Sequence, residues 1–256
     1  MAPQPAAPQP VAPQPAAPPS HRQKEVQMLY ALWSLKQGVG TTVAAAALAL
    51  HWAQNTKDGV LLVDLCGDLP YALGIPEPDK PGISDWLSAG NDLENDVLER
   101  LEVNVTTGLQ MLTRGRRPYA NDAQFNTLAR QLAADHRDVI IDCGCIWTHQ
   151  MNWTKQSEVS ATARFLIEAA DHSLLVTRSC FLALRRIARS PHQPSGIILM
   201  YEDGRALVAS DIADLGSCPI VLQIEVDVAI GRALDAGLLI NRLPQRLDKA
   251  LAKLNH

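Results

Sequence analysis

A short glycine-containing loop constrains this chain more than any other feature. It reads Lys36-Gln37-Gly38-Val39-Gly40-Thr41-Thr42. An apolar run over residues 28–33 precedes it, and an alanine-rich run over residues 43–53 follows it. A strand, a glycine turn and a helix N-terminus together form an arrangement in which backbone N–H groups converge on an anion. The sequence therefore predicts a phosphate-binding loop after the first strand.

The loop lacks the lysine of the usual pattern G-x-x-x-x-G-K-[ST]. Gly40 fits the second glycine and Thr42 fits the magnesium-binding hydroxyl, but Thr41 stands at the lysine position and Leu35 at the first glycine. A lysine–phosphate contact is worth about 1.5–3 kcal/mol, which is roughly 10- to 100-fold in affinity. We therefore expect weakened phosphate binding. Hydrolysis should suffer more, because it needs positive charge where transition-state charge accumulates.

Apolar runs of strand length alternate with helical patterns along the rest of the chain, which predicts an α/β fold. Most of these runs are continuously apolar, as expected when helices cover both faces of a parallel sheet. We expect a doubly wound, mostly parallel sheet of about seven strands in a three-layer α/β/α domain. The expected strands are residues 29–33, 60–63, 109–112, 139–141, 173–177, 196–200 and 221–224. The expected helices are residues 42–55, 84–89, 123–134, 157–169, 181–190, 211–215, 227–236 and 243–254.

The N-terminal segment differs in composition from everything that follows. Ala-Pro-Gln-Pro repeats occupy residues 2–5, 7–10 and 12–15. Such proline density excludes a helix or a central strand and favours extended polyproline geometry. We predict a disordered tail over residues 1–25 and a single domain over residues 26–256. The tail is either a tether or a docking peptide for a protein that recognises proline.

Charge and cysteine usage exclude several function classes. A net charge of −4 gives no global attraction to nucleic acid or to an anionic membrane. No run reaches the roughly 18–20 apolar residues of a membrane-spanning helix. The five cysteines, including Cys143-Gly144-Cys145, lack the spacing of zinc ligands. Their odd number and the absence of an apolar signal segment favour a reducing cytoplasm.

Further motifs follow the loop in order. Lys36 fits the early lysine of the variant loop K-G-G-x-G-K-[ST], from which Gln37 and Thr41 depart. Two apolar strands end in the aspartates Asp64 and Asp142. From about Met28 onward, the chain resembles the ParA/MinD family of P-loop ATPases, which position plasmids, division sites and pili in bacteria. The matching segments after the loop are residues 60–64, 138–142, 219–224, 233–237 and 243–244.

The resemblance implies a role for each motif residue. Residues 36–42 would bind ATP, with Thr42 and Asp142 holding Mg²⁺. Asp64 would contact the water or metal shell, and Lys36 would reach the phosphates of a partner subunit. The alternatives are structural: Thr42 caps its helix, Asp142 caps a turn, and Lys36 is a solvated loop lysine.

Other positions depart from the family pattern. Cys66 stands where the family often carries a second, water-orienting acid, and Asp68 comes two positions late. Glu202 lies near the position from which the family usually supplies an asparagine to adenine. Arg114 and Arg178 each follow a predicted strand, so either could replace the missing lysine as a bidentate phosphate ligand. Otherwise both are surface arginines that pair with local acids.

Two helical surfaces could meet partners. Arg185, Arg186 and Arg189 lie on one predicted helix and would hold DNA phosphates weakly, or else form a solvated face. The last helix carries one apolar stripe but lacks the basic polar face of a membrane-binding helix, so we expect it to pack on the domain. The stripe consists of Leu243, Leu247, Ala250, Leu251 and Leu254.

The sequence therefore predicts a degenerate ParA/MinD-like protein that binds ATP and Mg²⁺ weakly and hydrolyses ATP slowly or not at all. It would act in the cytoplasm as a spatial-organisation or assembly factor in cell division, chromosome partitioning or pilus positioning, including the kind found with Flp/Tad pili. A nucleotide-dependent homodimer and a partner of the proline-rich tail are the expected interactions. A competent Mg²⁺-dependent ATPase and a nucleotide-free scaffold are the alternatives.

Overall fold

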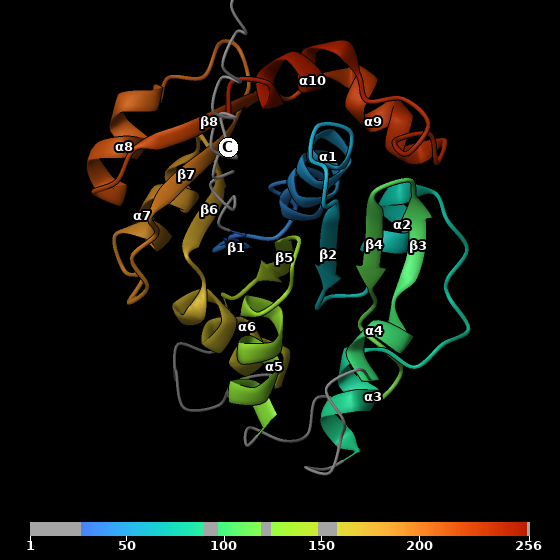
Figure 1. The fold of residues 1–256 in the computed structure, drawn as a ribbon. Coiled ribbons are helices and arrows are strands. Elements are labelled where there is room, and N and C mark those ends of the chain that lie inside the picture. The colour runs from blue at the N-terminus through green and yellow to red at the C-terminus, as the bar shows by residue number, and fades with distance from the viewer. Residues whose placement is uncertain (1–26, 90–96, 119–123, 148–157, 255–256) are drawn as a thin grey trace, which may run out of the picture.

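The structure is a computed structural model that describes residues 27–89, 97–118, 124–147 and 158–254. These residues form one sheet with helices on both of its faces (Figure 1). The predicted tail of residues 1–25 lies outside the described part, as do the expected first residues of two helices, Ala123 and Ser157.

Within the described residues the strand order is β3-β4-β2-β5-β1-β6-β7-β8. All neighbouring strands are parallel except β3 and β4. The chain runs outward from the central strand β1 in both directions, so the predicted doubly wound, mostly parallel sheet is confirmed. The strands are β1 (Leu29–Ser34), β2 (Val60–Asp64), β3 (Val103–Thr106), β4 (Leu109–Leu112), β5 (Asp138–Cys145), β6 (His172–Arg178), β7 (Gly196–Tyr201) and β8 (Ile220–Glu225).

The prediction of seven strands missed β3, which pairs antiparallel with β4 at one edge of the sheet. None of its four residues is buried, so it lacks the buried apolar run that identifies central strands such as β1 and β2. A two-residue turn with Gly108 at a φ of 77° joins β3 to β4. Just before β3, the carboxylate of Glu102 binds the buried guanidinium of Arg137 at 2.6 and 2.9 Å. This long-range ion pair fixes where the edge strand begins.

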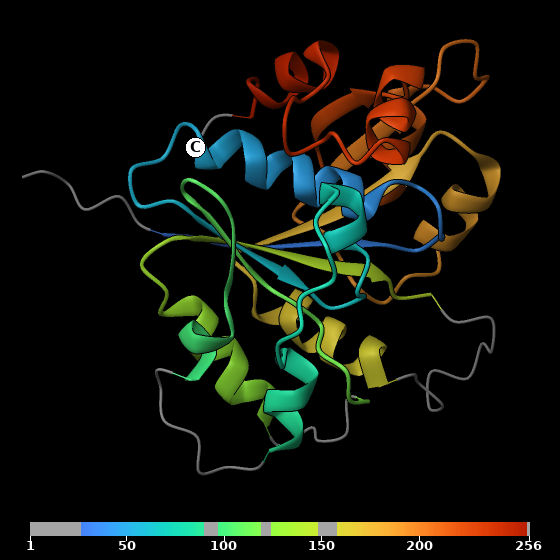
Figure 2. The same cartoon turned by 90° about the vertical axis from the view of Figure 1, so that its right-hand side faces the viewer.

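The helices form two layers, one on each face of the sheet (Figure 2). Helices α1, α2, α9 and α10 share one apolar core with the sheet, and the remaining helices share the other. The expected helices are present within three residues at each end, whereas α2 and α4 were not predicted. The helices are α1 (Thr41–Ala53), α2 (Leu69–Leu73), α3 (Ile83–Ser88), α4 (Val97–Leu101), α5 (Phe125–Ala133), α6 (Glu158–Ala169), α7 (Phe181–Ile187), α8 (Ala209–Gly216), α9 (Val228–Asp235) and α10 (Gln245–Leu251).

Helix α1 is the most deeply buried element on its face, with ten of its 13 residues buried. Its run of alanines lets the helix approach β1, β2 and β5 closely. The C-terminal helix α10 lies over α1, and its Leu247 and Leu251 are buried in the shared core. The expected packing of this helix on the domain is confirmed. Among the described residues, no helix is long and apolar enough to cross a membrane.

Candidate functional site

The glycine loop carries the chain from one face of the sheet to the other. Leu35, at the end of β1, is buried in the core that contains α7, while Val39 is buried in the core that contains α1. Gly38 and Gly40 have φ angles of 71° and 104°, which side chains rarely adopt. A Cβ at Gly40 would also lie 3.1 Å from Cε of Met200 on β7. The path of the loop across the sheet therefore depends on the two glycines that the motif retains. Gln37, which departs from the motif, is exposed.

The loop ends at the N-terminus of α1, with Gly40 as its N-cap. Gly40 has no side chain with which to cap this end of the helix. The first N–H groups of a helix have no intrahelical partner and carry its positive dipole end. An uncapped N-terminus next to a glycine turn therefore suits an anion, as the sequence predicted.

The two charge-related positions of the loop differ in exposure. Thr41, at the usual lysine position, is only 6% exposed. Lys36 is partly exposed, and its Nζ lies 3.5 Å from the carbonyl oxygen of Gln37. Lys36 is the one cation of the loop sequence. The fold thus has the glycine turn and helix N-terminus of the predicted loop but places no lysine at the start of α1.

Asp64 ends β2 and organises the turn that follows it. Its Oδ1 accepts hydrogen bonds from the N–H groups of Cys66 and Gly67 at 3.0 and 2.7 Å. Its Oδ2 accepts one from the N–H of Leu69 at 3.1 Å. Burial raises the pKa of Asp64 to about 6, although these hydrogen bonds oppose the rise. Both oxygens are therefore already bonded to the turn, so any metal contact of Asp64 would be indirect.

Asp142 lies on β5, where it pairs in register with Asp64 of the neighbouring strand β2, and it is fully buried. Its Oδ1 accepts a hydrogen bond from the N–H of Gly144 at 3.0 Å, but Oδ2 has no well-formed hydrogen bond with any described residue. Burial raises the pKa of Asp142 to about 7, the adjacent Thr42 hydroxyl lowers it, and Asp64 raises it further.

A buried carboxylate oxygen without a well-formed hydrogen bond, beside a hydroxyl at a helix N-terminus, is a donor set that fits a hard divalent cation. The residues at the predicted magnesium positions, Thr42 and Asp142, are therefore chemically suited to Mg²⁺. Among the described residues, no group of three or more His, Cys, Asp or Glu side chains forms a separate metal site.

The Sγ of Cys66 packs against Gly144 near the end of β5. A Cβ at Gly144 would lie only 2.2 Å from its Sγ, so this contact depends on glycine. Burial raises the pKa of the Cys66 thiol, and the carboxylates of Asp142 and Asp64 raise it further. The thiol is therefore neutral and cannot replace a carboxylate as a base. Asp68 is the N-cap residue of α2.

The two candidate replacement cations lie in different surroundings. Arg114 lines a cavity of about 220 Å³ together with Asp64 and Cys66. Its Cδ would lie 3.4 Å from a Cβ at Gly67, so its side chain runs along the turn after β2. Its carbonyl accepts a hydrogen bond from the N–H of Ser84 at 2.8 Å, which ties its backbone to α3.

Arg178 instead binds the carboxylate of Glu202 at 2.9 Å, and Glu202 also binds Arg205. The structure therefore brings Arg114, but not Arg178, to the predicted aspartate.

Sequence reasoning missed one residue of this region. Arg186, interpreted from the sequence as part of a DNA-binding or solvated arginine face, donates from Nη1 to the carbonyl oxygen of Leu35 at 2.6 Å. Arg185 on the same helix and Arg189, which lies beyond its end, are exposed. In the sequence, Arg186 differed from these two only in its helix face, because residues four apart such as Arg185 and Arg189 share a face that Arg186 does not.

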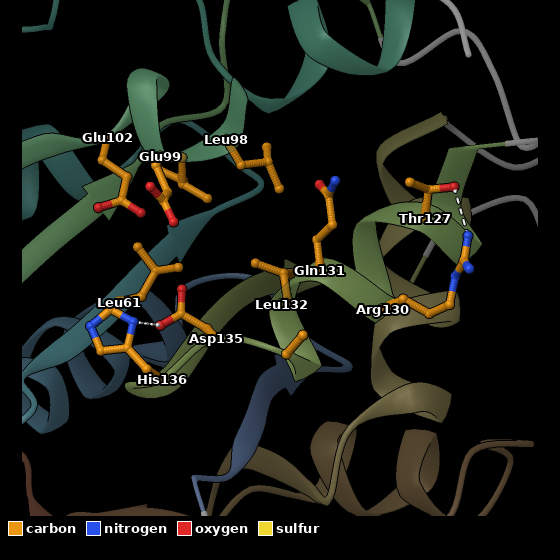
Figure 3. Close-up of a pocket in the computed structure, with 12 residues that line it drawn as sticks. Leu61, Leu98, Glu99, Glu102, Thr127, Arg130, Gln131, Leu132, Asp135 and His136 are labelled. Carbon is orange, nitrogen blue, oxygen red and sulfur yellow. Dashed lines mark hydrogen bonds and ion pairs between the residues drawn. The ribbon is translucent and has the colours of Figure 1, made fainter. Parts of the chain in front are cut away.

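A larger cavity of about 420 Å³ lies on the opposite face from α1, between α4 and α5 (Figure 3). Its wall carries Glu99, Glu102 and Asp135, with Arg130 on α5. Glu102 and Asp135 already bind Arg137. The cavity shares no residue with the glycine loop, so it is not part of the candidate nucleotide site.

Comparison with known proteins gives no match to a protein-family model and none to a curated protein sequence. Solved structures, in contrast, resemble the whole domain. The ParA family ATPase from Chlorobium tepidum TLS aligns with a TM-score of 0.72 at 20% identity, covering 90% of this chain and 98% of that chain.

Two further solved structures carry nucleotide. MinD from Pyrococcus horikoshii OT3, complexed with Mg-ADP, aligns with a TM-score of 0.66 at 18% identity, covering 89% of this chain and 94% of that chain. A Cyanothece McdA–ATP complex aligns with a TM-score of 0.56 at 17% identity, covering 89% of this chain and 95% of that chain. The chain therefore has the fold of the ParA/MinD family ATPases.

Proposed function

We propose that this protein is a degenerate ParA/MinD-like factor that binds Mg²⁺-nucleotide weakly and turns it over slowly or not at all. The observation that carries the proposal is the site at the start of α1. There the glycine-dependent loop and the unsatisfied Oδ2 of Asp142 coexist with a buried Thr41 at the lysine position. The nucleotide-bound neighbours of the same fold support the ligand class.

Magnesium would be held by the hydroxyl of Thr42 and, through water, by Asp142, with Asp64 in the outer shell. Bound Mg²⁺ supplies neutralisation of phosphate charge. The N–H groups at the start of α1 would orient the phosphates, since Gly40 has no side chain with which to cap them. A bound cation would compensate the negative charge of the buried Asp142 carboxylate, whose Oδ2 lacks a well-formed hydrogen bond, and this compensation would favour binding.

Arg114 is the cation that we assign to the role vacated by Thr41. It borders the same cavity as Asp64, and its guanidinium has the planar donor geometry that suits a phosphate. Arg178 is the weaker candidate, because it binds Glu202 and does not line the cavity beside Asp64.

Slow turnover follows from what surrounds the phosphate site. Thr41 supplies no charge to the transition state, and the neutral thiol of Cys66 cannot orient water as a carboxylate would. Nucleotide would therefore act as a ligand that changes assembly. Lys36 would reach the phosphates of a second copy in a nucleotide-dependent dimer, and the proline-rich tail would engage a protein partner. The cellular role would be spatial organisation or assembly in the cytoplasm, in division, partitioning or pilus positioning.

Calorimetric titration with Mg-ATP tests the binding claim, using Gly38→Ala and Gly204→Ala as a matched pair. Both glycines have positive φ angles, 71° and 78°, and a Cβ at either would have no heavy atom within 4 Å. Both variants should thus lose similar stability, about 1–2 kcal/mol. Only Gly38→Ala should also weaken Mg-ATP binding, by at least about 10-fold.

Equal affinities in the two glycine variants, or no saturable binding by the unmodified protein, would reject the nucleotide-binding proposal. The nucleotide-free scaffold would then be the remaining interpretation.

A further inference from the structure

An arginine from the opposite face of the sheet holds the first peptide of the glycine loop. Arg186 lies on α7, whose Leu184 and Ile187 are buried in the core on the face away from α1. From there its Nη1 reaches the carbonyl oxygen of Leu35 at 2.6 Å. A guanidinium–carbonyl bond of this length is a charge-assisted hydrogen bond, stronger than a bond between neutral groups.

The Arg186 guanidinium is itself positioned by an aromatic ring. Its central carbon lies 5.1 Å from the centroid of the Trp147 ring, within the range of a cation–π contact. Trp147 follows β5, so the arginine joins α7, the end of β5 and the start of the loop.

The carbonyl that Arg186 binds belongs to a critical residue of the loop. Leu35 is 3% exposed and is the last residue before the chain crosses toward Val39 on the other face. A carbonyl oxygen turned toward a bound phosphate would repel it, whereas one held toward α7 leaves the following N–H groups to face the anion. The next peptide lies within reach of a donor as well, because the single hydroxyl hydrogen of Ser34 is shared between the carbonyl oxygens of Lys36 and Gly144, at 3.3 and 3.2 Å from Oγ.

We infer that Arg186 is a positioning residue that fixes the crossing of the glycine loop and so preorganises it for a phosphate-bearing ligand. This inference rests on the proposed function for its ligand, but the positioning of the loop can be measured without any ligand. Arg186 acts through the loop backbone and need not touch the nucleotide. The loop lacks its usual lysine, so the strength of phosphate binding depends more on the order of its backbone.

The test compares Arg186→Met with Arg185→Met, which removes the adjacent arginine of the same helix. Arg185 is exposed and lies over the ring of Phe181, 5.9 Å from its centroid, so it serves as a matched control. Loop exchange is measured in the ligand-free proteins as hydrogen exchange of the amides of Ile146 and Ala44, which donate to the carbonyl oxygens of Ser34 and Gly40 on either side of the crossing. Arg186→Met should speed this exchange by about 10-fold, as expected for loss of one charge-assisted bond.

Mg-ATP affinity is measured on the same proteins. Arg186→Met should weaken binding by about 10-fold, Arg185→Met should leave it unchanged, and Arg186→Lys, which keeps one charged donor, should fall between. If Arg186→Met fails to fold, the comparison of Arg186→Lys with Arg185→Met decides the matter by the same readouts.

Each outcome has a separate meaning. Faster exchange confined to the loop supports the inference, and it does so even if the unmodified protein binds no Mg-ATP, a result that would reject only the proposed function. Unchanged loop exchange in the Arg186 variants overturns the inference. Exchange that rises equally across α7 and β6 also overturns it, because Arg186 would then be a general packing residue.

Discussion

Replacing Asp142 with asparagine should stabilise the ligand-free protein in a strongly pH-dependent way. Asp142 is fully buried, and burial raises the pKa of its carboxyl from 3.8 to about 7. Between these pH values the folded protein keeps a proton that the unfolded chain releases. The free energy of unfolding therefore falls as pH rises through this window, and the loss is complete above about pH 7.

The size of the effect follows from the same pKa values. A carboxyl whose pKa moves from 3.8 to about 7 destabilises the folded state by about 4 kcal/mol once it is ionised. Asp64 titrates together with Asp142, so the two residues share part of this cost. Asparagine keeps the oxygen that accepts from Gly144 but cannot ionise. We expect Asp142→Asn to raise the free energy of unfolding by about 2–4 kcal/mol at pH 8.5 and by less than about 1 kcal/mol at pH 4.

Urea denaturation at both pH values measures the effect, with Asp64→Asn as the control. The two oxygens of Asp64 accept three backbone N–H groups, so an amide nitrogen there would face a donor. Asp64→Asn should therefore destabilise the protein at pH 4, where Asp142→Asn is nearly neutral. The reasoning is refuted if Asp142→Asn is equally stabilised at both pH values or is destabilised at pH 8.5. In either case ionisation of the buried Asp142 carboxyl would not cost the folded state free energy.

Three further predictions concern binding, the tail and assembly. Thr41→Lys should tighten Mg-ATP binding by about 1.5–3 kcal/mol in calorimetry. It should also lower the melting temperature of the ligand-free protein, because Thr41 is buried. Thr41→Met, which adds no charge, should lower the melting temperature without tightening binding. Removing residues 1–20 should leave the melting temperature unchanged, since their proline repeats cannot form core elements; a large drop would make the tail part of the fold. Lys36→Ala should weaken dimerisation only in the presence of Mg-ATP, and a dimer in sedimentation that ignores both the nucleotide and this variant would contradict the assigned role.

The sequence predicted the central parallel strands well because β1, β2 and β7 are buried, continuous apolar runs that can be recognised without knowing which strands lie beside them. It also recognised Asp64 and Asp142 as the residues that follow two apolar runs, and the structure pairs these residues in register on neighbouring strands. It failed at β3, whose residues are only partly buried and whose start is fixed by Arg137, a residue 35 positions from its partner Glu102. Contacts of that kind cannot be seen in local periodicity.

Within the site, residue positions could be predicted but side-chain partners could not. Arg114 and Arg178 both follow strands, yet one borders Asp64 and the other binds Glu202, as the surface-pairing alternative allowed. The bond from Arg186 to Leu35 spans 151 positions and depends on how α7 packs under the sheet. The loop sequence predicted its glycine conformations directly, because positive φ angles at Gly38 and Gly40 are properties of those residues.

Binding of Mg-nucleotide without efficient turnover can be checked by measuring binding and hydrolysis on the same protein. The unmodified protein is titrated with Mg-ATP in a calorimeter, and phosphate release is followed in the same samples at saturation. We predict saturable, Mg²⁺-dependent binding with phosphate release near background. Rapid Mg²⁺-dependent phosphate release by the unmodified protein would contradict the account and identify a competent ATPase.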